Sequence, residues 1–174
     1  MKNITMIAAV GKNLELGKDN DLIWHFKGDM KFFRDHTLQK PIIMGRNTLE
    51  SLPKLLPERK HIVLTKKNIE IPGVFIVHSL DDLLNYIRQY GKEVMVIGGA
   101  SIYQQMLPYA DKMLLTEVNA ESKADVYFPE FYPEEWKKEV LEEKEENNIT
   151  YKHLVYTRNC LLYTSPSPRD PKTS

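Results

Sequence analysis

Runs of branched apolar residues recur between residues 4 and 118 and predict a series of short buried strands. The runs do not alternate strictly between polar and apolar positions, so both faces of each predicted strand should be covered. This pattern is typical of a parallel sheet with helices on either side. The six runs are ITMIAAV (4–10), PIIMG (41–45), HIVLT (61–65), VFIV (74–77), VMVIGG (94–99) and KMLLTEV (112–118).

The segments between these runs show helical spacing. The clearest helix follows Ser79, where apolar residues repeat at intervals of three and four over several turns. Ser79 and Asp82 form a capping pattern at its start, and Gly91 is placed to stop it. Asn47 is the expected N-cap of another helix, and Pro108 is the expected end of a third. The three further helices are predicted over residues 26–37, 47–52 and 100–107.

The alternation of strands and helices predicts an α/β fold. We expect a single domain with a mostly parallel, twisted central sheet of about eight strands and about four flanking helices. A chain of 174 residues suits one such domain. Residues 136–144 and 150–158 are expected to close the sheet as an antiparallel hairpin around Asn147 and Asn148.

The last fourteen residues, LLYTSPSPRDPKTS (161–174), differ in character from the rest of the chain. They combine three prolines with Ser and Thr, a composition that does not build a packed element. Appended sequence and a disordered extension are both open readings. The folded domain is therefore expected to span residues 1–160.

Composition excludes several classes of partner. Twenty-four Lys and Arg residues balance twenty-four Asp and Glu residues, so no net field would attract nucleic acid or an anionic membrane. No apolar run approaches the roughly 20 residues of a membrane span. Cys160 is the only cysteine, which suits the reducing cytoplasm. No metal is predicted, because the histidines lack metal-ligand spacing; they are His25, His36, His61, His78 and His153.

One acid stands in an unusually apolar segment, LIWHFKGDMKFF (22–33). If residues 26–37 are helical, Asp29 shares a face with Met30, Phe33 and Thr37. A carboxylate turned away from water persists only with a hydrogen-bonding partner, which favours a ligand. The alternative is that the helix begins late and Asp29 is its N-cap. The residues alone leave both readings open.

Two turns have the features of anion sites. MGRNTLES (44–51) and VIGGASIY (96–103) each run from a strand through glycine into a helix start, where free backbone N–H groups favour an anion. Arg46 adds a planar fork suited to phosphate, although an ordinary turn with a surface arginine has the same sequence. Ser101 is read as a helix cap and not as a nucleophile, because the segment departs from GxSxG. Together the two turns suit a pyrophosphate.

A third charged segment, LPERKHIVLTKK (56–67), surrounds a predicted strand. Arg59 precedes the strand, whereas Thr65 and Lys66 follow it, at the end where ligands of open α/β sheets bind. Lys67 is read as plain surface charge.

These motifs, in this order, resemble the dihydrofolate reductase family over residues 3–158. The similarity is carried by IAAV (7–10), LGKDNDLIWHFKGDMKFFRDHT (16–37), PIIMGRNTLESL (41–52), LPERKHIVLT (56–65) and VIGGASIYQQMLP (96–108).

The resemblance implies an NADPH-dependent oxidoreductase that passes a hydride to C6 of 7,8-dihydrofolate while a proton reaches N5. The product, 5,6,7,8-tetrahydrofolate, supports one-carbon metabolism. Asp29 would bind the pterin N3 and 2-amino group with support from Thr116, and water would be the proton donor to N5. Leu22 and Trp24 would lie on a loop, roughly residues 11–25, that closes over the nicotinamide.

The family's binding residues carry over by position. Substrate-binding residues would be Ile7, Ala8, Asp29, Met30, Phe33, Leu52, Leu56, Arg59, Ile97, Tyr103 and Thr116, with Arg59 on the glutamate α-carboxylate. Cofactor-binding residues would be Ala9, Leu16, Gly17, Asn20, Gly45, Arg46, Asn47, Thr48, Leu64, Thr65, Lys66, Ile97, Gly98, Gly99, Ala100, Ser101, Ile102, Tyr103 and Gln105. Arg46, Thr65 and Lys66 would meet the 2′-phosphate, and the peptide between Gly98 and Gly99 is expected to be cis.

The chain departs from the family at two places. Many members have Leu-Pro-Trp and Leu-Pro where this chain has Leu22-Ile23-Trp24 and Phe26-Lys27-Gly28, so a looser start of the helix is expected.

Two rival functions remain at this stage. One is a pyrimidine reductase of riboflavin synthesis, although Asp29 together with Arg59 favours folate. The other is a nucleotide-binding module without catalysis, which leaves Asp29 unexplained. A monomer is expected, since no long apolar helix face is left over.

Overall fold

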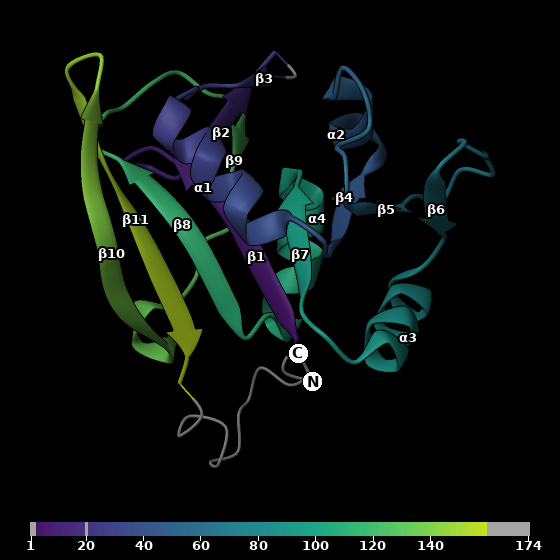
Figure 1. The fold of residues 1–174 in the computed structure, drawn as a ribbon. Coiled ribbons are helices and arrows are strands. Elements are labelled where there is room, and N and C mark those ends of the chain that lie inside the picture. Colours follow the sequence, from purple (N-terminus) through teal and green to yellow (C-terminus); the bar gives the residue numbers. More distant parts are fainter. Residues whose placement is uncertain (1–2, 20, 160–174) are drawn as a thin grey trace.

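The computed structural model describes residues 3–19 and 21–159, and every structural statement below refers to them. The expected tail, 161–174, and the expected cofactor residue Asn20 lie outside the described residues. The chain forms a single α/β domain around an eight-stranded, mostly parallel sheet, as predicted (Figure 1). The strands are, in sheet order, β10 (Trp136–Glu146), β11 (Ile149–Arg158), β8 (Lys112–Val118), β1 (Ile4–Val10), β7 (Val94–Gly98), β4 (Pro41–Gly45), β5 (Lys60–Leu64) and β6 (Val74–Val77).

The six strands predicted from apolar runs are confirmed, with boundaries shifted by at most one residue. They pair in parallel from β8 to β6 across the sheet. The predicted hairpin is also present: β10 and β11 run antiparallel, and β11 pairs antiparallel with β8. Its turn residues Asn147 and Asn148 have φ of 55° and 64°, a left-handed conformation that Asn tolerates better than most residues.

A second, three-stranded sheet lies beside the large one and was not predicted. It contains β2 (Glu15–Lys18), β3 (Asp21–Leu22) and β9 (Val126–Tyr127), in the order β3-β2-β9. Strands of two to four residues carry too few apolar positions to show periodicity. Part of the segment expected as a loop, residues 11–25, therefore belongs to this sheet.

Four helices flank the large sheet, and their bounds differ from the predicted ones by at most one residue. Gly45 and not Asn47 is the N-cap of the second helix, because Gly45 is the last residue with extended backbone. The fourth helix ends at Met106, one residue before the predicted end, and passes into a 3₁₀ turn that contains Pro108. Ser101 lies inside that helix behind the N-cap Gly99, so the reading of Ser101 as a cap is wrong. The helices are α1 (Lys27–Thr37), α2 (Arg46–Ser51), α3 (Leu80–Tyr90) and α4 (Ala100–Met106); the 3₁₀ turns are η1 (Leu107–Tyr109) and η2 (Pro133–Glu135).

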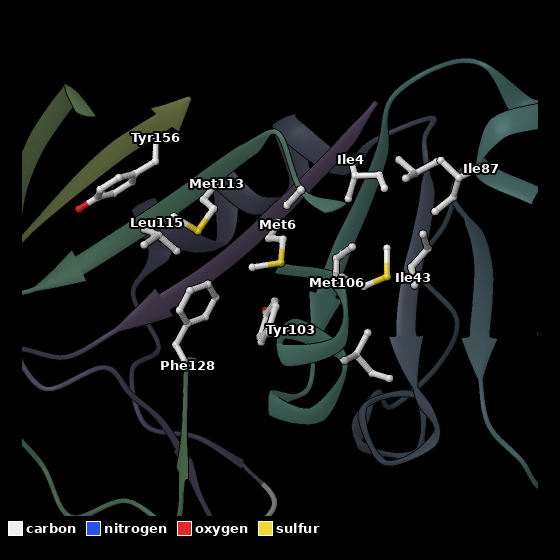
Figure 2. Close-up of a cluster of buried hydrophobic side chains, with 14 of the residues drawn as sticks. Ile4, Met6, Ile43, Ile87, Tyr103, Met106, Met113, Leu115, Phe128 and Tyr156 are labelled. Atoms are coloured by element: carbon white, nitrogen blue, oxygen red, sulfur yellow. The ribbon is translucent and has the colours of Figure 1, made fainter. Parts of the chain in front are cut away.

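The apolar core lies in two layers, one on each face of the sheet. On one face, side chains of β1, β7 and β8 pack with Tyr103 and Met106 of α4 and with Phe128 (Figure 2). On the other face, Ile7, Ile42 and Met95 pack against α1 and α2. Both faces of the central strands are thus covered, which explains why their apolar runs do not alternate.

Candidate active site

The acid singled out in the sequence lies in the first turn of α1 and points toward β8 and β11. The N-cap of α1 is Phe26, so the reading of Asp29 as the cap is wrong. The Asp29 side chain is 19% exposed. Thr116 Oγ1 donates a hydrogen bond to Asp29 Oδ1 at 2.5 Å, and His153 Nε2 lies 3.2 Å from the same oxygen. Within the described residues no hydrogen bond reaches Oδ2, so this oxygen is available to a ligand.

Five of the expected substrate residues pack together in the apolar layer on the face of the sheet that α1 covers. Ile7 is buried in the layer that packs against α1, and the partly buried side chains there include Phe33, Leu52, Leu56 and Ile97. Polar groups beside an apolar layer of this kind give a ligand both orientation and burial.

Three other expected substrate residues are not part of this layer. The side chain of Ala8 packs against the opposite layer, and Met30 is 64% exposed. Tyr103 is buried on the opposite face, where its hydroxyl donates to the Ile7 carbonyl at 2.6 Å. Burial, and then the negative charge of Asp29, raise the pKa of Tyr103, so the phenol remains a hydrogen-bond donor. Tyr103 therefore fixes the backbone beneath the substrate side and does not present its ring there.

Arg59 lies at the start of β5 and reaches toward the end of α1. Its Nη1 donates to Thr37 Oγ1 at 3.2 Å, and its Nε donates to the Pro57 carbonyl at 3.0 Å. Burial, and then the positive charge of Arg34, lower the pKa of the Arg59 guanidinium. Two cations near each other favour an anion between them. Arg34 was not singled out in the sequence, because it resembles any surface charge in the last turn of a helix.

The two glycine turns lie side by side at the carboxyl ends of β4 and β7. The strands are neighbours, with Met44 paired to Gly98. A Cβ added at Gly45 would lie 3.2 Å from Ile102, and one added at Gly99 would lie 3.4 Å from Thr48 Oγ1. Glycine therefore lets each turn approach the helix of the other. The peptide between Gly98 and Gly99 is cis, as the resemblance implied.

Both helices after these turns begin without a side-chain cap. Their first backbone N–H groups are therefore not occupied by a capping side chain, and such groups suit the oxygens of a diphosphate. The set of donors fits the nucleotide cofactor that the sequence implies.

The basic residues expected at the cofactor's 2′-phosphate follow the ends of β4 and β5. Arg46 forms an ion pair with Glu50 within α2, so an incoming phosphate would compete with this carboxylate. Thr65 follows β5, and its carbonyl lies 3.0 Å from His78 Nδ1. His78 was not singled out, because it lies thirteen residues from Thr65 and comes close only through the pairing of β5 with β6. Lys66 is exposed beside Thr65.

The remaining cofactor residues occupy several elements. Four of them have side chains packed in or against the core layer that contains Tyr103, namely Leu16, Leu64, Ala100 and Ile102. Ala9 lies on β1 opposite Thr116, Gly17 lies on β2, and Gln105 donates to Ser101 Oγ on α4 at 3.1 Å. Asn47 and Thr48 lie in the first turn of α2.

The segment expected to close over the nicotinamide is held at its base by a buried carboxylate. Glu15 accepts hydrogen bonds from the N–H groups of Asn13 at 2.7 Å and Ser122 at 3.0 Å. Burial raises the pKa of Glu15, but these N–H donors, Ser122 first, outweigh it and lower the pKa overall. Farther along, Leu22 is 57% exposed, and the Trp24 indole N–H is buried without a partner among the described residues.

Neither a metal centre nor a membrane span is found in the described part of the chain. Residues 3–19 and 21–159 contain no cluster of His, Cys, Asp and Glu that could hold a metal ion. No helix in the same ranges is long and apolar enough to cross a membrane.

Comparison with known proteins identifies relatives over nearly the whole described chain. A sequence model of the family described as Dihydrofolate reductase matches residues 3–158. The dihydrofolate reductase of Haemophilus influenzae is 39% identical over 157 residues, which cover 88% of this chain and 98% of that protein. That of Bacillus subtilis is 40% identical over 159 residues, covering 89% and 94%. That of Buchnera aphidicola from Acyrthosiphon pisum is 43% identical over 134 residues, covering 75% and 83%.

Proposed function

The chain belongs to the dihydrofolate reductase family, and we propose that it reduces 7,8-dihydrofolate to 5,6,7,8-tetrahydrofolate with NADPH. One hydride passes to C6 of the pterin and one proton reaches N5, so the reaction consumes NADPH and a proton and releases NADP⁺. The pyrimidine reductase alternative is not favoured, because the family match and the relatives all carry the name dihydrofolate reductase.

The observation that carries this proposal is the arrangement of Asp29. Its Oδ1 is held by Thr116, its Oδ2 has no hydrogen bond in the described residues, and the apolar layer of Ile7 and Phe33 lies on the same face. A carboxylate placed in this way can accept two parallel N–H bonds from the amidine-like edge of a pterin. Low exposure strengthens such a pair. Asp29 thus orients and polarises the ring, and water delivers the proton to N5.

Cofactor binding is assigned to the two glycine turns. The turns at Gly45 and at Gly98–Gly99 would cradle the pyrophosphate, and NADPH, when bound, supplies the hydride. Arg46, with Thr65 and Lys66, would bind the 2′-phosphate and favour NADPH over NADH. The segment carrying Leu22 and Trp24 would exclude water from the nicotinamide.

We further propose that the domain, residues 1–160, works as a monomer in the cytoplasm. Cys160 is the only cysteine in the sequence, and its use fits a reducing compartment.

Turnover tests the function directly. The purified protein should oxidise NADPH when dihydrofolate is added, followed by the loss of absorbance of the reduced nicotinamide. Asp29→Asn should reduce the rate of hydride transfer by roughly a hundredfold or more at neutral pH, while NADPH affinity stays nearly unchanged. Asp35→Asn is the matched control, because Asp35 is an exposed acid of the same helix, paired with Lys31. No oxidation above background, or an undiminished rate in Asp29→Asn, would contradict the proposal.

Arg46→Leu tests the choice of cofactor. Loss of a bidentate phosphate contact should raise the KM for NADPH about tenfold or more and leave the KM for NADH nearly unchanged. Lys67→Leu, on the surface beside Lys66, should change neither value. Equal losses for both nucleotides would remove Arg46 from the 2′-phosphate.

A further inference from the structure

His153 is a fully buried histidine that lies between two carboxylates, and the resemblance gave it no role. Its side chain is 0% exposed. Its Nε2 lies 3.2 Å from Asp29 Oδ1, and its Nδ1 lies 2.7 Å from Glu142 Oε2. Glu142 is 43% exposed, so the chain of contacts runs from the candidate active site to the surface.

Strand register builds this chain of contacts. His153 on β11 pairs with Thr116 on β8 and with Glu142 on β10, so the three side chains form a row across three strands. The register of β10 shifts between Val140 and Glu142. Without this irregularity Leu141 would lie opposite His153, and Glu142 would follow on the other face. Bulges commonly re-aim a side chain beside an active site, and here the bulge brings a carboxylate to the imidazole.

Aromatic packing holds the imidazole in place. Phe32 of α1 stacks on it with ring centroids 3.9 Å apart and an interplanar angle of 11°, and Tyr151 meets it edge-on at 5.5 Å. These contacts fix the ring plane, so that both nitrogens point along the row of polar groups. The titratable or charged groups around the ring come from three elements. α1 contributes Asp29 and, on the far side of Phe32, His36. β10 contributes Glu142, whose Oε1 lies 3.8 Å from Lys144 Nζ, and β11 contributes Tyr151. Lys31 of α1 acts on Glu142 from a distance.

The hydrogen-bond partners require two protons on the ring. Ionised carboxylates only accept hydrogen bonds, and a neutral imidazole donates from one nitrogen only. His153 can donate to both Asp29 and Glu142 only when both ring nitrogens carry a proton, which makes the ring an imidazolium. The hydrogen bond from His153 lowers the pKa of Glu142, so the outer carboxylate is ionised at neutral pH.

We propose that His153, kept as an imidazolium by Glu142, is a positioning residue for Asp29. Its Nε2–H and the Thr116 hydroxyl together hold Oδ1, which leaves Oδ2 turned toward the substrate. The positioning role rests on the proposed function, because His153 acts through Asp29. The charge of the His153 ring does not depend on the proposed function.

The charge of the ring can be observed without turnover. In long-range ¹H–¹⁵N spectra of the ligand-free protein at neutral pH, both ring nitrogens of His153 should be protonated. Glu142→Gln should leave one proton, on Nε2, because the neutral amide does not stabilise the charge of the ring, while Nε2–H can still donate to the Asp29 carboxylate and the amide N–H can donate to Nδ1. Glu143→Gln is the matched control, since Glu143 is an exposed neighbour on β10 that pairs with Lys152. A bare ring nitrogen in the wild type, or two ring protons in Glu142→Gln, would overturn the proposal.

Kinetics then test the positioning role. His153→Phe keeps an aromatic ring against Phe32 but removes both polar contacts. The KM for dihydrofolate should rise roughly tenfold, the size of one lost charge-assisted hydrogen bond, while the KM for NADPH is unchanged. In Glu142→Gln the alkaline limb of the pH profile of kcat/KM should move to lower pH, because the imidazolium loses its neighbouring anion.

The kinetic and spectroscopic results distinguish two ways in which these hypotheses can fail. A lower melting temperature in His153→Phe and Glu142→Gln with an unmoved pH profile would mean a structural role only and would overturn the proposal. If the wild type does not reduce dihydrofolate, the proposed function fails, and the ring spectra alone decide the state of His153.

Discussion

Helices α1 and α3 are each eleven residues long, but their first turns are completed in different ways. α3 is capped by its neighbour in sequence, since Ser79 Oγ accepts a hydrogen bond from Asp82 N at 3.0 Å. The N-cap of α1 is Phe26, whose side chain cannot accept one. Glu146, at the end of β10, instead accepts from Lys27 N at 2.9 Å and Gly28 N at 2.8 Å, across 119 and 118 residues of sequence.

The difference matters because α1 carries Asp29 and α3 carries none of the proposed site residues. The start of α3 is set by residues within one turn, so its position depends on the local sequence alone. The start of α1 is set by the hairpin, through Glu146 and through Tyr151, which stacks on Phe26 at 4.5 Å. The position of Asp29 is therefore linked to the assembled sheet. A negative charge at this helix start also complements the helix dipole.

The largest effect is expected from Gly28→Ala, which removes the space that the α1 cap needs. An added Cβ would lie 2.4 Å from the Tyr151 hydroxyl and 3.1 Å from Glu146 Oε2. Overpacking of this kind should lower the free energy of unfolding by about 1–3 kcal/mol, and displacement of α1 should lower activity as well. Chemical denaturation and dihydrofolate turnover measure the two effects.

A second variant and a control sharpen the result for Gly28. In a Tyr151→Phe background the closest clash is absent, so Gly28→Ala should be much less destabilising there than in the wild type. Gly91→Ala at the end of α3 is the control, because an added Cβ there meets no atom within 4 Å. The backbone φ of +74° at this position should lower the free energy of unfolding of the alanine variant by about 1 kcal/mol. Turnover should be unaffected. Equal losses of activity in Gly28→Ala and Gly91→Ala would mean that α1 is no more closely coupled to the site than α3.

An intermediate effect is expected from Ser79→Ala, which removes the local cap of α3. The free energy of unfolding should fall by about 1 kcal/mol, the usual value for an N-cap serine. The KM for dihydrofolate should stay unchanged, because α3 carries none of the proposed site residues. A change in KM larger than the change in stability would contradict the view of α3 as an independent element.

The smallest effect is the pH dependence of the stability that the α1 cap contributes. The hydrogen bond from Tyr151, and then the one from Gly28 N, lower the pKa of Glu146 below its model-compound value of 4.5. A depressed pKa in the folded protein means that the cap stabilises fully above this value and is lost as pH falls through the lowered pKa. In denaturation series below pH 5, Glu146→Gln should therefore lose less stability on acidification than the wild type. Ser79→Ala should follow the wild-type slope, since no titrating group is removed.

Sequence reasoning succeeded where the determining interactions are local or follow from topology. The buried strands, the cap and stop of α3 and the Asn147–Asn148 turn all depend on residues within one element. The approach of Gly45 to Gly98–Gly99 was also foreseen, because the carboxyl ends of parallel strands share one edge of a sheet. The resemblance supplied Asp29 and Thr116 as partners, and the structure brings them into contact.

What the sequence did not reveal depends on register and on contacts between distant segments. No local pattern indicates that β10 is irregular next to Leu141, and this irregularity decides that Glu142 faces His153. Asp29 and His153 are separated by 124 residues. The residues alone left open whether Asp29 is the cap of α1, because an acid near a helix start is often its cap, whereas here the capping acid, Glu146, comes from β10.

The hydrogen bond between His153 of β11 and Asp29 has a consequence for biosynthesis. During translation α1 leaves the ribosome early. His153 lies 124 residues after Asp29, so it is added roughly ten seconds later at ordinary elongation rates. During that interval the nascent polypeptide carries Asp29 without the imidazole that positions it, and Gly28 without its capping carboxylate. Substrate affinity should therefore arise only after translation of the final hairpin, and stalled chains that end before it should not bind dihydrofolate.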